Sequence, residues 1–430
     1  METLIPMKSK TLKQKGCTGI GCSRGAAMKY DFTSILDRQG MDSMAVDLET
    51  AGAFRPQGET LPEFDRIPMW VADMNFPTAP SVSEAIIRRA QHPAFGYYVP
   101  RPEYYQSIIR WHQKRNHVTG MKEENIGYEN GVLGGVVSAL NVLCSRGDYI
   151  LVHSPTYIGF TGTLEENGFH LALSPLKRDA EGIWRMDLAD MEEKIKKYHI
   201  HAAILCSPHN PTGRVWTMEE LKEAADLFEK YEVYLLSDEI WSDLLLDGHI
   251  HTPTQTVSDY ARSHTVALYA PSKTFNLAGL IGSYHIIYDR WLKERVESQS
   301  ALSHYNSMNV LSMHALIGAY SEEGMEWVDE LRQVLGTNVR MIYSYLNECV
   351  PGIELAEPEG TYMLLPDCEG YCREHGITVD ELQRRGVRYG VIWQDGRPFH
   401  GKWSIRINAA LPVSRTEEAL RRMKQYIFNP

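Results

Sequence analysis

Residues 201–240 read HAAILCSPHNPTGRVWTMEELKEAADLFEKYEVYLLSDEI, and this stretch combines the signals of two strands and one helix. A short apolar run ends in a turn-rich segment, an amphipathic helix follows, and a second buried strand comes next. Thr217 is expected to cap the helix, because Glu220 stands three residues later and completes a capping box. The order strand, helix, strand is typical of a parallel sheet unit.

The same alternation extends on both sides, from about Tyr128 to about Tyr288. Further apolar runs predict buried strands at 149–155, 264–270 and 282–288. Strands that alternate with amphipathic helices indicate an α/β protein whose mostly parallel sheet is covered on both faces. Ligands of such sheets bind beyond the carboxyl ends of the strands. Asp238 and Lys273 fall at two such ends, and the turn with Asn210 follows a third.

The two ends of the chain have different patterns. The C-terminal part predicts a long helix, a strand-like segment with a turn, a strand and a charged helix, over 326–349, 352–367, 402–411 and 414–428. Residues 1–27 are basic and Gly/Ser-rich and lack the apolar core of a secretory signal, so we expect a mobile tail. Cys17 and Cys22 lie in this tail, but no second Cys/His pair completes a metal site, and we assign no metal.

Composition narrows the class of protein. The chain has 430 residues, of which 43% are hydrophobic and 23% charged, which is globular composition with length for two domains. The formal net charge of −11 argues against a nucleic-acid or anionic-membrane surface. No apolar run reaches 18 residues, and seven cysteines, an odd number, argue against a disulfide framework. We therefore expect a cytoplasmic protein.

Several candidate residues together match the needs of an aldehyde cofactor with a phosphate and a pyridine ring. Such a cofactor needs a lysine, a carboxylate at the ring nitrogen, a donor to the ring oxygen, an aromatic face and backbone N–H groups for the phosphate. The chain offers Lys273, Asp238, Asn210, Tyr157 and the glycine-bearing turn Gly131-Val132-Leu133, and Arg406 for a substrate carboxylate. Each alone has an ordinary reading as a strand-end cap, a turn residue, a packed tyrosine or a surface arginine. Their joint occurrence favours the cofactor.

The motifs HNPTG, SDEIW, PSKTFNLAGL and IRIN, in this order, resemble the fold-type I pyridoxal-phosphate enzymes, the aspartate aminotransferase superfamily. IPMWVADMNF, SPHNPTGRVWTMEEL and PEGTYMLLPD are similar to the cystathionine β-lyase / cysteine-S-conjugate β-lyase branch. The resemblance runs from Met28 nearly to the end. It implies a mostly parallel seven-stranded sheet with helices on both faces in a large domain over 76–310. A smaller α+β domain would be formed by 28–75 and 311–430.

The resemblance also implies roles for individual residues. Lys273 would be the Schiff-base lysine and general base, and Asp238 the partner of the pyridine nitrogen. The remaining cofactor contacts would come from Asn210 at the ring oxygen, Tyr157 stacked on the ring, Gly131, Val132 and Leu133 at the phosphate, and Ser272 beside the lysine. The substrate would be bound by Arg406, Asn210 and Trp241, with Arg406 at its α-carboxylate. Tyr97 would reach the phosphate of the other subunit, which makes a homodimer part of the site.

Four positions depart from the branch pattern. Trp241 stands where histidine or tyrosine is usual, and an indole cannot replace the hydroxyl of tyrosine. Ala270 replaces a common serine, Asn75 replaces an aspartate, and the segment INAALPVS lacks the usual cysteine. None of these departures removes a residue that the cofactor chemistry requires, but together they bear on which substrate is bound and which reaction follows. We expect Asn210 to carry most of the ring-oxygen contact and Trp241 to act mainly on substrate preference.

Three functions fit these residues. Branch resemblance favours β-elimination from cystathionine or another cysteine-type thioether, which gives a thiol, pyruvate and ammonia. Aminotransfer between amino acids is the alternative, and a dicarboxylate substrate would need a second cationic group that the sequence does not point to. A cofactor-bearing regulator with little catalysis is a more distant alternative, because residues 1–27 are too few for a DNA-binding domain.

Overall fold

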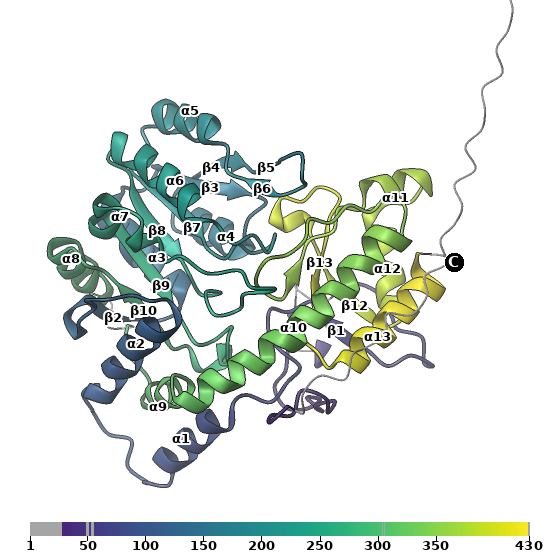
Figure 1. The fold of residues 1–430 in the computed structure, drawn as a ribbon, viewed down its shortest axis with the longest axis horizontal. Coiled ribbons are helices and arrows are strands. Elements are labelled where there is room, and N and C mark those ends of the chain that lie inside the picture. Colours follow the sequence, from purple (N-terminus) through teal and green to yellow (C-terminus); the bar gives the residue numbers. More distant parts are fainter. Residues whose placement is uncertain (1–27, 49–50, 53–55, 303, 305, 429–430) are drawn as a thin grey trace, which may run out of the picture.

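The centre of the fold is a seven-stranded sheet in the order β2-β10-β9-β8-β7-β3-β4 (Figure 1). The structure, a computed structural model, describes residues 28–48, 51–52, 56–302, 304 and 306–428. The strands of the sheet are β2 (Ile126–Glu129), β3 (Tyr149–Ser154), β4 (His170–Pro175), β7 (Ala202–Cys206), β8 (Tyr234–Asp238), β9 (Thr265–Tyr269) and β10 (Ser283–Ile286). β10 runs antiparallel to both neighbours, and the other adjacent pairs are parallel. The expected tail over 1–27, with Cys17 and Cys22, lies outside the described residues.

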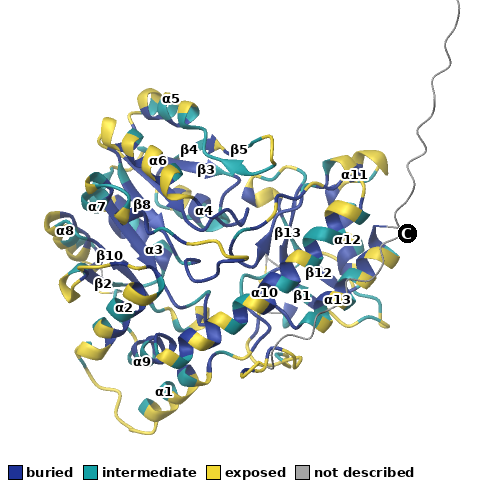
Figure 2. Cartoon of the chain, in the orientation of Figure 1, coloured by how far each residue is buried: buried dark blue, intermediate teal, exposed yellow. Residues whose placement is uncertain are grey.

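Helices cover both faces of this sheet, because its strands alternate two apolar faces. Ile150 and Val152 of β3 join a core with α3, α4 and α8, whereas Leu151 between them joins a core with α5 and α6 on the other face. The helices of this part are α1 (Pro80–Ala90), α2 (Pro102–Arg115), α3 (Val132–Leu143), α4 (Ile158–Glu166), α5 (Leu188–Tyr198), α6 (Met218–Lys230), α7 (Asp259–His264), α8 (Arg290–Ala301) and α9 (Val310–Ala319). Figure 2 shows the resulting buried strands between half-exposed helices.

A smaller four-stranded sheet has the order β1-β12-β13-β11. Its strands are β1 (Ile67–Met69), β11 (Met363–Leu364), β12 (Val391–Asp395) and β13 (Ile405–Asn408), and its helices are α11 (Glu369–Glu374), α12 (Val379–Arg388) and α13 (Val413–Arg422). The long helix α10 (Glu322–Cys349) contacts α1 and α9 as well as α13, and so connects the two parts of the molecule (Figure 1). β1 pairs in parallel with β12, although the two strands lie more than 300 residues apart in sequence. The N-terminal and C-terminal parts of the chain therefore build one sheet.

Short elements complete the fold. β5 (Lys177–Arg178) and β6 (Trp184–Arg185) form a two-stranded ribbon. The described residues also form five short helical turns: η3 (Glu123–Asn125), η4 (Thr254–Thr256), η5 (Ala278–Leu280), η6 (Arg397–Phe399) and η7 (Met423–Ile427). No helix among the described residues is long and apolar enough to cross a bilayer. Free thiols are present at Cys144, Cys206, Cys368 and Cys372.

The predicted fold class and its local signals agree with the structure. The mostly parallel seven-stranded sheet, the helices on both faces and the smaller mixed sheet are confirmed. The capping box is confirmed too, because the Glu220 N–H donates to the Thr217 hydroxyl at 3.2 Å and Glu220 accepts from the Thr217 N–H. The strand expected over 352–367 is mostly irregular. Its Glu359 and Gly360 N–H groups donate to the Gly213 carbonyl, so this backbone is paired with the HNPTG turn instead of the sheet.

Candidate active site

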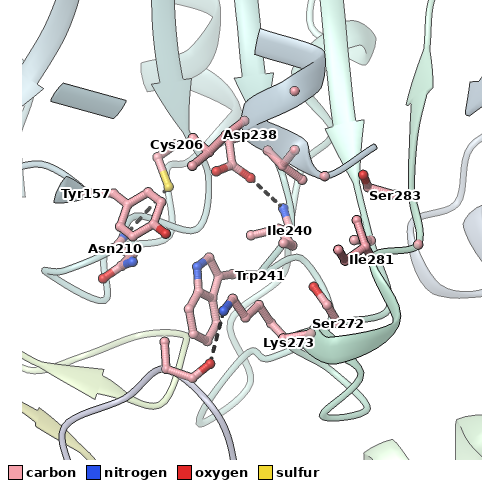
Figure 3. A pocket seen from close by; sticks show the side chains of 18 of the residues that line it. Tyr157, Cys206, Asn210, Asp238, Ile240, Trp241, Ser272, Lys273, Ile281 and Ser283 are labelled. Carbon is pink, nitrogen blue, oxygen red and sulfur yellow. Dashed lines mark hydrogen bonds between the residues drawn. The ribbon is translucent and has the colours of Figure 1, made fainter. Parts of the chain in front are cut away.

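The predicted site residues converge on a cavity of about 250 Å³ at the carboxyl edge of the large sheet (Figure 3). In the strand register Cys206 of β7 lies opposite Asp238 of β8, which lies opposite Leu268 of β9, so these three strands end together. The predicted residues that line the cavity are Lys273, Asp238, Asn210, Tyr157, Gly131, Val132, Leu133, Ser272 and Trp241. Arg406 and Tyr97 do not line it.

Asp238 is a buried carboxylate with spare capacity for a cation. One of its oxygens accepts the Ile240 N–H at 3.1 Å. No other described group donates to this carboxylate, and Figure 3 shows it at the wall of the cavity. Burial raises the pKa of Asp238 to about 7, against the smaller opposing effects of the Ile240 N–H and of Lys273. A cationic ring nitrogen placed here would relieve that cost.

Lys273 follows β9 and lines the cavity. Its Nζ donates to the Ala72 carbonyl at 3.0 Å and lies 5.9 Å from the centre of the Trp241 ring. Burial, and next the charge of Arg406, lower the pKa of Lys273 to about 8. An amine with this pKa is partly neutral close to neutral pH, which a base or a nucleophile requires.

The turns that carry these two residues are tied together behind the cavity. The Thr274 hydroxyl donates to one oxygen of Asp243 at 3.0 Å, and the Trp111 indole donates to the other at 3.0 Å. Thr274 follows Lys273 directly, and Asp243 follows Asp238 by five residues. The buried Asp243 carboxylate therefore fixes the segment after β9 against the segment after β8.

The start of α3 offers backbone donors to an anion. Gly131 precedes the helix with φ of 85°, a conformation that favours glycine. The Gly131 N–H already donates to the Glu129 carbonyl at 3.0 Å. The N–H groups of Val132 and Leu133 have no acceptor among the described residues, as expected for the first turn of a helix. Val132 and Leu133 are thus better candidates than Gly131 for binding a phosphate.

Tyr157 forms an aromatic wall, and glycine makes room for it. A Cβ atom at Gly159 would lie 2.3 Å from the Tyr157 ring. Beside the ring lies Cys206, whose sulfur accepts the Asn210 N–H at 3.5 Å. Sequence reasoning missed Cys206, although its place at the end of an apolar strand run was a usable signal.

Arg406 reaches the site through Asn210. Its guanidinium donates to the Asn210 Oδ1 at 3.3 Å, to the Trp70 carbonyl at 3.1 Å and to the Gln394 side chain. The same group lies 4.3 Å from the centre of the Phe399 ring, and its Nε has no partner among the described residues. Burial lowers the pKa of Arg406 to about 10. The predicted binding of a substrate carboxylate by Arg406 stays a prediction.

The other departures from the family pattern have different surroundings. Ala270 lines the cavity, so the missing hydroxyl is a real loss of a donor there. Asn75 does not line it. Its NH₂ group donates to the Pro68 and Ala410 carbonyls at 3.3 Å each, and its carbonyl oxygen accepts from Arg38 at 3.0 Å. These bonds connect the N-terminal segment that carries Arg38 to the smaller sheet. Asn75 therefore links backbone segments and does not line the cavity.

Tyr97 is fully exposed and does not line this cavity. It lies in the segment between α1 and α2, in which residues 91–97 are exposed (Figure 2). Its predicted contact with a second subunit is a prediction that a single chain does not test.

Known proteins resemble this chain in sequence and structure. A sequence model of the aminotransferase class I and II family matches residues 67–423. Cystathionine beta-lyase PatB of Bacillus subtilis is 34% identical over 370 residues, which are 85% of this chain and 94% of that protein. Protein MalY of Escherichia coli is 30% identical over 91% of this chain and 97% of that protein. The PLP-bound C–S lyase from Staphylococcus hominis has a TM-score of 0.83 at 29% identity, covering 93% of this chain and 99% of that one.

Proposed function

The chain belongs to the aminotransferase class I and II family, and we propose that within this family it is a pyridoxal 5'-phosphate-dependent C–S β-lyase. Its substrate is cystathionine or another cysteine-type thioether, and its products are a thiol, pyruvate and ammonia. The observation that carries the lyase assignment is the likeness to cystathionine beta-lyase PatB over 94% of that protein.

The described residues fit this cofactor in three respects. The first turn of α3 has unpaired N–H groups at Val132 and Leu133, which suit a phosphate. Asp238 is buried with a raised pKa and little hydrogen bonding, which suits a protonated ring nitrogen. Lys273 has a lowered pKa and lines the same cavity, which suits a covalent link to an aldehyde.

When bound, the cofactor supplies an electron-withdrawing ring that accepts the electron pair of a substrate carbanion. Asp238 holds a proton at the ring nitrogen, which keeps that ring electron-poor. The amine of Lys273 removes the proton from the substrate α-carbon, because a pKa of about 8 leaves part of it neutral near pH 7. Arg406 binds the α-carboxylate after it gives up a present acceptor, for which the Trp70 carbonyl at 3.1 Å is the candidate.

The cavity lining disfavours one form of the alternative, aminotransfer. Among the described residues that line the cavity, Lys273 is the one cation. A dicarboxylate amino acid would place its second carboxylate there without a counter-charge, at a considerable desolvation cost. Most of the remaining lining is apolar or aromatic, including Ile240, Trp241 and Ile281, and this suits a thioether side chain.

One experiment separates the two reactions. The purified protein is incubated with cystathionine, and separately with alanine plus 2-oxoglutarate, while pyruvate, ammonia and glutamate are measured. We expect pyruvate and ammonia in the first incubation and little glutamate in the second. Lys273→Ala is the control that must produce neither. Brisk glutamate formation, with no pyruvate from any thioether, would replace the lyase by an aminotransferase.

We also propose that the protein acts as a cytoplasmic homodimer with shared sites. The support is the exposed segment between α1 and α2, where Phe95, Tyr97 and Val99 leave apolar surface uncovered. Mixing inactive Lys273→Ala subunits with inactive Tyr97→Phe subunits would then restore activity, since one site of each hybrid is intact. Absence of recovery, with subunit exchange shown by a tag, would count against Tyr97 as a shared residue.

A further inference from the structure

Trp241 is a buried side chain that lines the cavity three residues after Asp238. Its ring meets the Tyr362 ring edge to face, with centroids 4.8 Å apart and planes at 76°. The Tyr362 hydroxyl in turn donates to the Ala72 carbonyl at 3.1 Å. The indole is therefore held by packing, and its position does not depend on a ligand.

The indole N–H of Trp241 has no acceptor among the described residues, unlike those of Trp70, Trp111 and Trp216. Trp393 and Trp403 also lack one, but their nitrogens are sealed inside protein, whereas that of Trp241 is not. Figure 3 shows the Trp241 nitrogen on the side of the cavity that Tyr157 and Asn210 face. A buried donor that opens into a cavity points to an acceptor on the ligand.

The side chain of Asn210 indicates the charge of the ligand atom that would accept from Trp241. The Asn210 Oδ1 is taken by Arg406 at 3.3 Å, which leaves the Asn210 NH₂ as the free end of the amide. No described group accepts from this NH₂. Two N–H donors, from Asn210 and Trp241, therefore border the same space, and two donors favour an oxygen that carries negative charge.

We propose that Trp241 donates its indole N–H to the ring oxygen of the cofactor and shares that oxygen with Asn210. This rests on the proposed cofactor, and it differs from our expectation from sequence that Trp241 acts mainly on substrate preference. An indole N–H donates without accepting and does not ionise in the working pH range. The ring oxygen is thus held in its ionised form by donors that no proton transfer can remove.

A pH titration of the holoenzyme tests this role. The visible absorbance of the bound cofactor changes with the proton shared between the ring oxygen and the linked Lys273 nitrogen. Donors that neutralise the oxygen weaken its hold on that proton, so Trp241→Phe should raise the midpoint by about one pH unit or more. Trp241→His, which restores an N–H, should move the midpoint back toward the wild-type value. The exposed Trp291→Phe is the matched control and should leave it unchanged.

The charged groups that act on Lys273 are Arg406, Asp73 and Asp238, and every variant keeps them. A second measurement is the affinity ratio for pyridoxal phosphate over its 3-deoxy analogue, which lacks the ring oxygen. We expect the ratio to fall by about tenfold in Trp241→Phe, even if both affinities drop. An unchanged midpoint or an unchanged ratio, in a protein that binds the cofactor, would overturn the role of Trp241 alone. A wild-type protein that binds no cofactor would overturn the proposed function as well.

Discussion

Asp238 and Glu239 are neighbours in sequence, and both carboxylates are buried, yet they lie in opposite surroundings. Asp238 faces the cavity and accepts one hydrogen bond, from Ile240. Glu239 lies in a closed network, where it bonds to His251 Nε2 at 2.7 Å, the Tyr269 hydroxyl at 2.5 Å, the Ser237 hydroxyl at 2.9 Å and the Thr254 N–H at 3.0 Å. Successive strand-end residues point to opposite sides, which separates the two groups.

The difference shows that burial alone does not set the charge of a carboxylate. Burial raises the pKa of Asp238 to about 7 because its partners are few. Burial acts on Glu239 too, but the charge and hydrogen bond of His251, followed by Tyr269 and Thr254, hold its pKa below the ordinary value. On the side of Asp238, which we call the cavity side, polar groups stay unpaired and can bind a ligand. On the side of Glu239, the network side, the polar groups are hydrogen-bonded within the protein. We expect the first to control activity and the second to control stability.

The largest effect on the cavity side is expected from Lys273→Ala. Loss of the amine removes the base, so kcat should fall by about 10⁴-fold. The covalent link to the cofactor should vanish from the visible spectrum as well. Steady-state kinetics and absorbance check this, with the exposed Lys222→Ala as a control that keeps both. Turnover close to wild type in Lys273→Ala would remove the lysine from the chemistry.

A smaller loss of activity is expected from Asp238→Asn. An amide cannot hold a proton at the ring nitrogen, so kcat/KM should fall by about 10³-fold, or about 4 kcal/mol. Thermal stability should stay at or above that of wild type, because a poorly paired buried carboxylate is lost. Asp226→Asn on the surface of α6 is the matched control. A destabilised but fully active Asp238→Asn would contradict the division between the two sides.

Glu239→Gln should show the converse. Glutamine keeps one acceptor oxygen where Glu239 has two, so one pair of donors, His251 with Tyr269 or Ser237 with Thr254, loses its acceptor. We expect the free energy of unfolding to fall by about 4 kcal/mol. The kcat/KM of the folded protein should change only a few-fold. Urea denaturation and kinetics check both, with the exposed Glu229→Gln for comparison. A stable variant with greatly reduced kcat/KM would show that the network serves the chemistry directly.

The two carboxylates should also give stability profiles of opposite sign against pH. Between about pH 4 and pH 7 folded Asp238 holds a proton that the unfolded chain has lost, so stability of the cofactor-free protein falls as pH rises. Glu239 has a lowered pKa, so its contribution is present above about pH 4.5 and is lost as pH falls.

Asp238→Asn should therefore flatten the fall between pH 4 and pH 7, by about 4 kcal/mol at its upper end. Glu239→Gln should flatten only the loss in acid. Unfolding by urea at a series of pH values measures both. Identical profiles for the two variants would mean that the surroundings of the two carboxylates do not differ in solution.

Sequence reasoning succeeded where chemistry follows from local pattern. Lys273, Asp238 and Asn210 could be placed together because parallel strands end at one edge of a sheet. Thr217 could be placed at a helix start because a capping box is contained in four residues. The domain boundaries at 75 and 310 stay a prediction.

The rest depends on contacts that no local pattern encodes. The Ala72 carbonyl reaches Lys273 across 201 residues, and Tyr362 fixes the Trp241 ring from a distant segment. The donor direction of the indole follows from that packing. The Gly131 N–H, which the sequence placed at a phosphate, donates to the Glu129 carbonyl two residues earlier, a local turn bond that the glycine-bearing motif did not predict.

Several of the polar contacts at this site come from the main chain. The Lys273 amine donates to the backbone carbonyl of Ala72, and the Arg406 guanidinium donates to that of Trp70. The N–H groups without an acceptor at the start of α3 are the backbone groups of Val132 and Leu133. An alanine scan leaves each of these atoms in place, so it would score such positions as tolerant even where they do essential work. Changes to the backbone itself, such as proline at position 133 or an ester in place of the amide there, would test these main-chain contacts.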